Sequence, residues 1–366
     1  MAASSADRPR STLDGRVADS AELRALYGLW LYDILICQYR AAGQEAERFQ
    51  RVAETETSAG EVPTADRMMA MVLHYLGDQT GTRACAERSL AAPAPANRYA
   101  HSARYGLDQR VGAQVQLARA LWLLGRPEQA WQVAQSAISE AAAVGHANSM
   151  CLALADGACI VALLSGNLAE AERFAASLDE YADRHALGVW RTYGHALRGR
   201  LLVQHGRALD GAALLRSALG DLHDTPSDIR FQLYLVWLAE VLEAAGQAAE
   251  ALAAVTEALE RAERTEERWY LPELLRLRGE ILLRLDPLRF AAEARDCLAR
   301  SLGMAQGQEV LAWELRTTMS LVRLRRGETS DAALHAMLAG VVGRFSEGFA
   351  TTDLVAAQRL LDTLRP

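Results

Sequence analysis

The most informative absence in this sequence of 366 residues is lysine, since all 39 basic residues are arginines. A P-loop needs a lysine to reach the nucleotide phosphates, and a Schiff base needs a lysine amine. The zinc-binding pattern HExxH and the nucleophile pattern GxSxG are absent as well. We therefore expect a protein that is not an enzyme and that uses no metal or cofactor.

Paired cysteines and long apolar runs are also missing. The five cysteines are odd in number and form no CxxC pair, which argues against a disulfide framework and against a zinc knuckle. The opening MAASSADRPRSTLDG lacks the apolar core of a secretory signal, and no run of about 18 apolar residues follows it. The sequence predicts a cytoplasmic protein with buried thiols at Cys37, Cys85, Cys151, Cys159 and Cys297.

Positive charge is in the minority along the chain. A net charge of -7 and a pI near 5.7 leave no broad basic surface for the phosphates of nucleic acid. We expect no direct contact with nucleic acid and none with a membrane.

Helical hairpins are abundant. The string VGAQVQLARALWLLGRPEQAWQVAQSAISEA has apolar residues at helical spacing, breaks at GRP, and then resumes the same period. The turn glycines Gly125, Gly166, Gly206 and Gly246 are 41, 40 and 40 residues apart. Positions that extend this series are Asp286 and Gly327 on one side, and, less regularly, Gly43 and Gly77 on the other.

Small residues recur on both sides of these turns. Gly199 and Gly279 stand inside helices, where glycine costs about 1 kcal/mol relative to alanine, so close helix packing must recover that cost. Such a pattern, at a period of about 34 residues or somewhat more, indicates a tetratricopeptide-like array. We predict an all-α, right-handed solenoid of about eight hairpins with a C-terminal capping helix. It forms one domain over residues 20–366, after a disordered tail or linker over 1–19.

Two segments interrupt the hairpin pattern. In AAPAPANRYAHSARYGLDQ, the prolines and Asn97 predict a structured loop over one face. Near the end, RFSEGFATTDL predicts a turn rather than a ligand site. Gly348 should end the last hairpin helix in a left-handed cap, Phe345 and Phe349 should pack at the junction, and a closing helix should begin at Thr351 or Thr352.

Five strings resemble a known family. In order, they are RYGLDQRVGAQVQLARALWLLGRPEQA, GHANSM, ERWYLPELLRLRGEILL, LAWELRTTMSLVRL and RFSEGFATTDLVAAQRLLDTL. Together they resemble the C-terminal tetratricopeptide region of bacterial predicted ATPases of the signal-transduction type, over about residues 20 to 364. GHANSM departs from the pattern, because Ala147 and Asn148 stand where relatives usually show proline and an aromatic residue.

The resemblance implies a sensing region. In that family the helical region usually follows a nucleotide-binding module, with a winged-helix or adenylate/guanylate cyclase domain upstream. This chain would then be either a piece of a larger regulator or a free-standing relative of the sensing region. An NTPase module in cis or in trans is the partner that the resemblance implies.

The first helix of each hairpin should line a concave groove, where a partner would bind. Counting back from the turns, we select as contact residues Arg119, Trp122, Asp156, Tyr193, Arg200, Glu240, Glu273, Arg276 and Glu280. Charges in a concavity are costly unless they meet an opposite charge or a bound group.

Two interpretations of these charges stay open. Arg200 could pair with Glu240, and Arg276 with Glu280 or Glu273, as structural ion pairs across repeats. Alternatively, Arg119, Arg200 and Arg276 could present planar forks to a small anionic ligand, a peptide or a protein domain. The leading functional hypothesis is a non-catalytic sensor and interaction module of a signal-transduction or transcription regulator. The alternative is a scaffold that self-associates, for example as a homodimer, and binds nothing in its groove.

Overall fold

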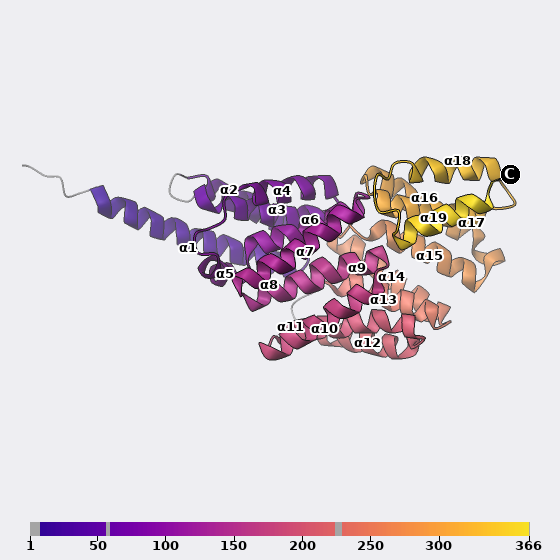
Figure 1. The fold of residues 1–366 in the computed structure, drawn as a ribbon, viewed down its shortest axis with the longest axis horizontal. Coiled ribbons are helices and arrows are strands. Elements are labelled where there is room, and N and C mark those ends of the chain that lie inside the picture. The colour runs from indigo at the N-terminus through magenta and orange to yellow at the C-terminus, as the bar shows by residue number, and fades with distance from the viewer. Residues whose placement is uncertain (1–7, 56–58, 224–228, 366) are drawn as a thin grey trace, which may run out of the picture.

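The structure is a computed structural model that describes residues 8–55, 59–223 and 229–365. Within these ranges the regular structure is helical, and the one β contact is an isolated bridge between Arg326 and Thr329. Figure 1 shows helical hairpins that follow one another in chain order from indigo to yellow. The predicted all-α, tetratricopeptide-like solenoid is confirmed.

The described chain forms eight hairpins and a closing helix. The first four are α1 (Arg8–Leu35) with α2 (Tyr39–Ala53), α3 (Val62–Leu76) with α4 (Gln79–Ala91), α6 (Gln109–Leu123) with α7 (Pro127–Val144), and α8 (Ala147–Leu152), η2 (Ala153–Cys159) and α9 (Ile160–Ser165) with α10 (Leu168–Arg184). The next four are α11 (Gly188–Leu201) and η3 (Leu202–His205) with α12 (Ala208–His223), α13 (Phe231–Ala244) with α14 (Ala248–Thr265), α15 (Leu271–Leu285) with α16 (Pro287–Gly307), and α17 (Leu311–Arg325) with α18 (Asp331–Val342). Outside the hairpins lie η1 (Ala59–Glu61), α5 (Arg98–Tyr105) and the closing helix α19 (Thr352–Thr363).

The turn glycines adopt the conformation that their spacing predicts. Gly125, Gly166, Gly206 and Gly246 have φ values of 79°, 76°, 69° and 76°, in the left-handed region that glycine enters without a steric cost. The prediction that Gly43 is a turn glycine is wrong, because Gly43 lies inside α2. The first hairpin turns instead near Cys37, whose φ is 59°.

Close helix packing accounts for the glycines inside helices. A Cβ atom at Gly199 would lie 2.9 Å from the carbonyl oxygen of Gly211 on the partner helix. At Gly279 a Cβ atom would lie 3.1 Å from Leu298 Cγ and 3.2 Å from the carbonyl oxygen of Ala294. The predicted reason for both glycines, a close crossing of the two helices of a hairpin, is confirmed.

Two local predictions need correction. Asn97 begins the helix α5 instead of only breaking one, because its side chain accepts a hydrogen bond of 2.9 Å from the backbone N–H of Ala100. Gly348 has a φ of 79°, but α18 already ends at Val342, so Gly348 does not cap that helix. Phe349 is 59% exposed and does not pack at the junction.

Other parts of the RFSEGFATTDL stretch agree with the prediction. Phe345 is buried in a small core with α17, α18 and α19, and α19 begins at Thr352. At the other end, α1 begins at Arg8, inside the segment that the sequence assigns to a tail; the assignment of residues 1–19 as a linker stays a prediction.

One helical stretch, Ala147–Ser165, is long and apolar enough to span a membrane, but 78% of it is buried inside the protein.

The superhelix turns far enough for distant hairpins to touch. The backbone N–H of Arg268 donates to the carbonyl of Tyr75 at 2.7 Å, and the hydroxyl of Tyr39 donates to Glu267 at 3.1 Å. Farther along this seam, Glu347 Oε1 accepts from the backbone N–H of Glu128 at 2.9 Å. These contacts join residues that are 193 to 228 positions apart, so the superhelix closes on itself around its inner face.

Candidate functional site

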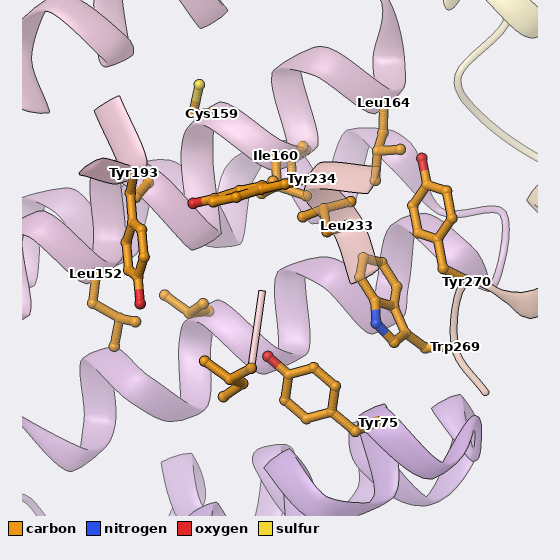
Figure 2. Packing of buried hydrophobic residues seen from close by; sticks show 14 of the residues in the cluster. Tyr75, Leu152, Cys159, Ile160, Leu164, Tyr193, Leu233, Tyr234, Trp269 and Tyr270 are labelled. Atoms are coloured by element: carbon orange, nitrogen blue, oxygen red, sulfur yellow. The ribbon is translucent and has the colours of Figure 1, made fainter. Parts of the chain in front are cut away.

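Aromatic side chains from the whole superhelix meet on its inner face. Figure 2 shows Tyr75 of α3, Tyr193 of α11, Tyr234 of α13 and Trp269, which precedes α15, around one interior region. All four are at most 4% exposed. We call this aromatic interior the inner chamber.

Four arginines stack on aromatic rings of the inner face. Arg67 lies over Trp30, at 4.9 Å from the ring centroid, and Arg119 lies over Trp269 at 4.5 Å. The guanidinium of Arg230 is 4.1 Å from the ring centroid of Tyr193, and that of Arg316 is 5.0 Å from Trp313. Arginine suits such positions because its planar group is weakly hydrated and stacks on aromatic faces.

Near the C-terminus the inner charges neutralise one another. Glu273 is fully buried and accepts two hydrogen bonds from Arg276, at 2.7 and 2.8 Å, and one from Arg316 at 3.1 Å. Arg276 also pairs with Glu280 at 2.6 Å. Because two guanidinium groups face it, the pKa of Glu273 falls to about 2 although burial alone would raise it.

Arg316 connects three distant parts of this region. Besides Glu273, it pairs with Asp353 of α19 at 2.8 Å and donates to the carbonyl of Leu164 at 3.1 Å. The neighbouring pair of Arg200 and Glu240 has an Nε–Oε2 distance of 2.6 Å. The predicted ion pairs of Arg200 with Glu240 and of Arg276 with Glu273 and Glu280 are therefore present. Only the first crosses repeats, because both pairs of Arg276 lie within α15, and this part of the prediction is wrong.

The π-helical segment η2 places Asp156 on the inner face. Its carboxylate pairs with Arg230, with an Nε–Oδ1 distance of 3.0 Å, and is 9% exposed. A Cβ atom at Gly157 would lie 3.2 Å from Val115, so this segment packs tightly on α6. Single-turn π segments are rare and occur frequently at functional sites.

Near the N-terminus the inner charges are not neutralised. Arg67 is 2% exposed and Arg119 is 4% exposed, yet neither has a carboxylate within ion-pair distance among the residues that the structure describes. Within the same ranges, no hydrogen-bond acceptor is in reach of Arg67 Nε, Arg67 Nη1 or Arg119 Nε. Burial without an anion lowers the pKa of Arg67.

Glutamines on the inner face show the same lack of partners. The buried Gln116 has a free amide oxygen, and Gln232 has neither amide atom hydrogen-bonded in the described part of the chain. Buried polar atoms in folded proteins nearly always have a partner, so each orphan needs a water, an ion or a ligand.

Glu267, a buried acid whose pKa Arg119 influences, is only partly ionised at neutral pH. Glu267 accepts hydrogen bonds from Tyr39 at 3.1 Å and from Trp269 Nε1 at 2.8 Å. Burial raises its pKa from 4.5 to about 7, against the opposing influence of these hydrogen bonds and of Arg119.

A cavity of about 410 Å³ opens onto one of these groups, Arg67. It lies between α1, α3, α8 and α11, and its lining includes Leu31, Arg67, Trp190, Tyr193 and Arg230. Asn148, the position that departs from the family pattern, lies at this cavity and accepts a hydrogen bond of 2.6 Å from Trp190 Nε1.

The nine predicted contact residues are thus all on or beside the inner face, but in two environments. Arg119, Trp122, Asp156 and Tyr193 lie with the aromatic interior, and Trp122 donates to Ser165 at 3.1 Å. The other five belong to the paired network. In the described ranges, no group of three His, Cys, Asp or Glu side chains is placed to hold a metal ion.

The sequence reasoning missed Arg230, Glu267 and Arg316. Arg230 and Glu267 precede their helices, outside the periodic register. Arg316 had a usable signal, since it follows Arg276 by 40 residues, the spacing of the turn glycines.

Comparison with known proteins supports the fold. No family model matches the chain. An uncharacterized protein of Rhizobium meliloti (strain 1021) is 28% identical over 221 residues, which are 58% of this chain and 21% of that protein. The chain therefore spans about a fifth of the length of this relative.

Two solved structures have the same architecture. A Rap protein complexed with competence and sporulation factor matches with a TM-score of 0.61 and 11% identity, over 94% of this chain and 98% of that chain. The Rap conjugation gene regulator of the plasmid pLS20, in complex with the Phr* peptide, matches with a TM-score of 0.51 and 13% identity, over the same shares. At these identities the likeness shows a helical-repeat fold, and it is the tetratricopeptide-like solenoid described above.

Proposed function

We propose that this chain is a non-catalytic sensor module of a bacterial signal-transduction or transcription regulator, and that it binds a peptide or a segment of a partner protein along its inner face. The observation that carries the proposal is a set of buried polar atoms without hydrogen-bond partners, on Arg67, Arg119, Gln116 and Gln232. Arg67 among them lines a cavity of about 410 Å³. A bound main chain offers both donors and acceptors to such groups.

The structural likeness supports a peptide as the ligand class. Both Rap proteins of similar fold are described in complex with a factor or peptide. An NTPase module, in cis or in trans, is the partner to which the bound state would be relayed. That part of the proposal rests on the resemblance of the sequence to signal-transduction ATPases.

A matched pair of substitutions on α1 tests the proposal. Leu31 lines the cavity, whereas Leu29 on the same helix is 52% exposed. Leu31→Trp should fill the cavity, and Leu29→Trp should add the same ring outside it. Wild-type protein and both variants are used to select binders from a library of displayed random peptides.

Peptides that bind the wild type and Leu29→Trp but not Leu31→Trp are the expected result. Peptides that bind all three proteins equally would place recognition outside the cavity. If no peptide is enriched while the protein self-associates in sedimentation experiments, the scaffold alternative holds and the proposal is wrong.

A further inference from the structure

The inner surface of α6 carries a row of polar groups. Gly112, Gln116 and Arg119 are spaced i, i+4 and i+7, so they share one side of the helix. The guanidinium of Arg67 lies against the first of them, because a Cβ atom at Gly112 would be 2.6 Å from Arg67 Nε. The row therefore runs from Arg67 at the cavity, past Gln116, to Arg119.

This row has a defined length and charge. Seven residues of α-helix span about 10 Å, which is the length of roughly three residues of extended peptide. Its two ends are cations that are 2% and 4% exposed, and the amide between them has a free oxygen. Such buried cations are costly unless an anion meets them.

The neighbouring carboxylates leave Arg67 and Arg119 available to an external anion. The carboxylate of Asp156 is already paired with Arg230, which lines the cavity. The carboxyl of Glu267 is held by Tyr39 and Trp269 on the seam, away from the cavity lining. The aromatic rings beneath both arginines fix their planes, so less freedom is lost when a carboxylate binds.

We propose that Arg67, Gln116 and Arg119 form a carboxylate-binding row, and that the ligand of the chamber is an extended acidic peptide segment. This inference rests on the proposed function and names the chemistry of its ligand. The carboxylates of the peptide pair with the two guanidinium groups, and a backbone N–H of the peptide donates to the oxygen of Gln116. A free C-terminus and an acidic side chain both supply the required group.

Three synthetic probes separate these sources. They are hexaglutamate with an amidated C-terminus, hexaglutamine with a free C-terminus, and hexaglutamine with an amidated C-terminus. Binding is measured by calorimetry with the full chain. We expect at least one carboxylate probe to bind about tenfold or more tightly than the fully neutral probe. Whichever carboxylate probe binds identifies the source.

Substitutions assign the effect to the row. Arg67→Gln and Arg119→Gln should each remove the preference for the carboxylate probe, while Arg51→Gln, the same charge change at an exposed position of α2, should retain it. Circular dichroism checks that the variants fold. If they do not, inorganic phosphate added to the wild type supplies the test, since it should compete with the carboxylate probe.

The outcomes distinguish this inference from the proposed function. If all three probes bind the wild type equally and Leu31→Trp abolishes them, the chamber binds peptide but the carboxylate row is wrong. If only phosphate binds, and Arg119→Gln removes it, the row is an anion site but the peptide is wrong. Absence of binding by every probe overturns the carboxylate row, and so does an equal loss with Arg51→Gln; the proposed function is then decided by the peptide selection alone.

Discussion

The inner faces of the two halves of the superhelix carry the same residue type under opposite conditions. In the C-terminal hairpins, Arg276 and Arg316 face Glu273, Glu280 and Asp353, at N–O distances of 2.6 to 3.1 Å. In the N-terminal hairpins, Arg67 and Arg119 are 2% and 4% exposed and have no such partners among the described residues. The comparison shows that inner charge in one half holds hairpins together, as Arg316 does with Glu273. We propose that the other half keeps its cations for an external anion.

The largest expected effect comes from breaking the paired network. Arg276→Met should lower the free energy of unfolding by about 3 to 5 kcal/mol, because it removes one of two cations from the fully buried Glu273. Urea denaturation measures the change. The exposed Arg51→Met is the control and should stay within about 0.5 kcal/mol of the wild type.

The two buried carboxylates should give opposite pH dependences. Glu267 has its pKa raised from 4.5 to about 7, so the folded state binds the proton more tightly than the unfolded state. The contribution of Glu267 to the free energy of unfolding is fully present below about pH 4.5, and it falls by on the order of 3 kcal/mol as the pH rises to about 7. Glu267→Gln should remove the decline, which thermal melts between these pH values would show.

Glu273 supplies the opposite slope. Its pKa is lowered from 4.5 to about 2, so its contribution is present above the unfolded value and is lost as pH falls from about 4.5 to about 2. Glu273→Gln should flatten this acid limb and leave the neutral one. If Glu267→Gln and Glu273→Gln changed the same part of the plot of stability against pH, the two carboxylates would share one environment.

A smaller effect is expected at the seam between the halves. Glu347 accepts hydrogen bonds from the backbone N–H groups of Glu128 and Gln129, at 2.9 and 3.1 Å, and so caps α7 from a distant hairpin. Glu347→Ala should cost about 1 kcal/mol, the usual value of a helix cap. Hydrogen exchange should quicken at the start of α7. Exchange that is unchanged there would show that the seam does not stabilise this helix.

The smallest effect has the opposite sign. Arg119→Met should leave stability unchanged or raise it by up to about 1 kcal/mol, because the substitution removes a buried cation without stranding an anion that depends on it. Urea denaturation near pH 6, where Glu267 is mostly protonated, isolates the effect. A loss as large as that of Arg276→Met would mean that Arg119 is a structural residue, and the contrast between the halves would disappear.

The sequence predicts the periodic part of this account well. Turn glycines, small residues at helix crossings and the inner positions of first helices all follow from a period of about forty residues, which is a local property. Arg200 and Glu240, which are one period apart, form the ion pair that one of the two open interpretations predicts.

The features that the sequence does not predict depend on contacts between distant hairpins, which form as the superhelix closes. Contacts such as Tyr39 with Glu267 join segments 228 residues apart, and no local pattern encodes them. Arg230 and Glu267 were missed for this reason, because they lie in inter-helix segments whose partners come from other hairpins. The π-helical turn that presents Asp156 also escapes a helical period of 3.6.

The central claim is that, among the residues that the structure describes, the inner face carries buried cations without an anion in its N-terminal half and paired cations in its C-terminal half. Anomalous diffraction from crystals soaked in sodium bromide tests it directly, because bromide occupies cationic sites that lack a counter-charge. The account predicts a bromide beside Arg67 or Arg119 and none within the network of Glu273, Arg276 and Arg316. Bromide in that network, or bromide on exposed arginines while the chamber holds none, would contradict it.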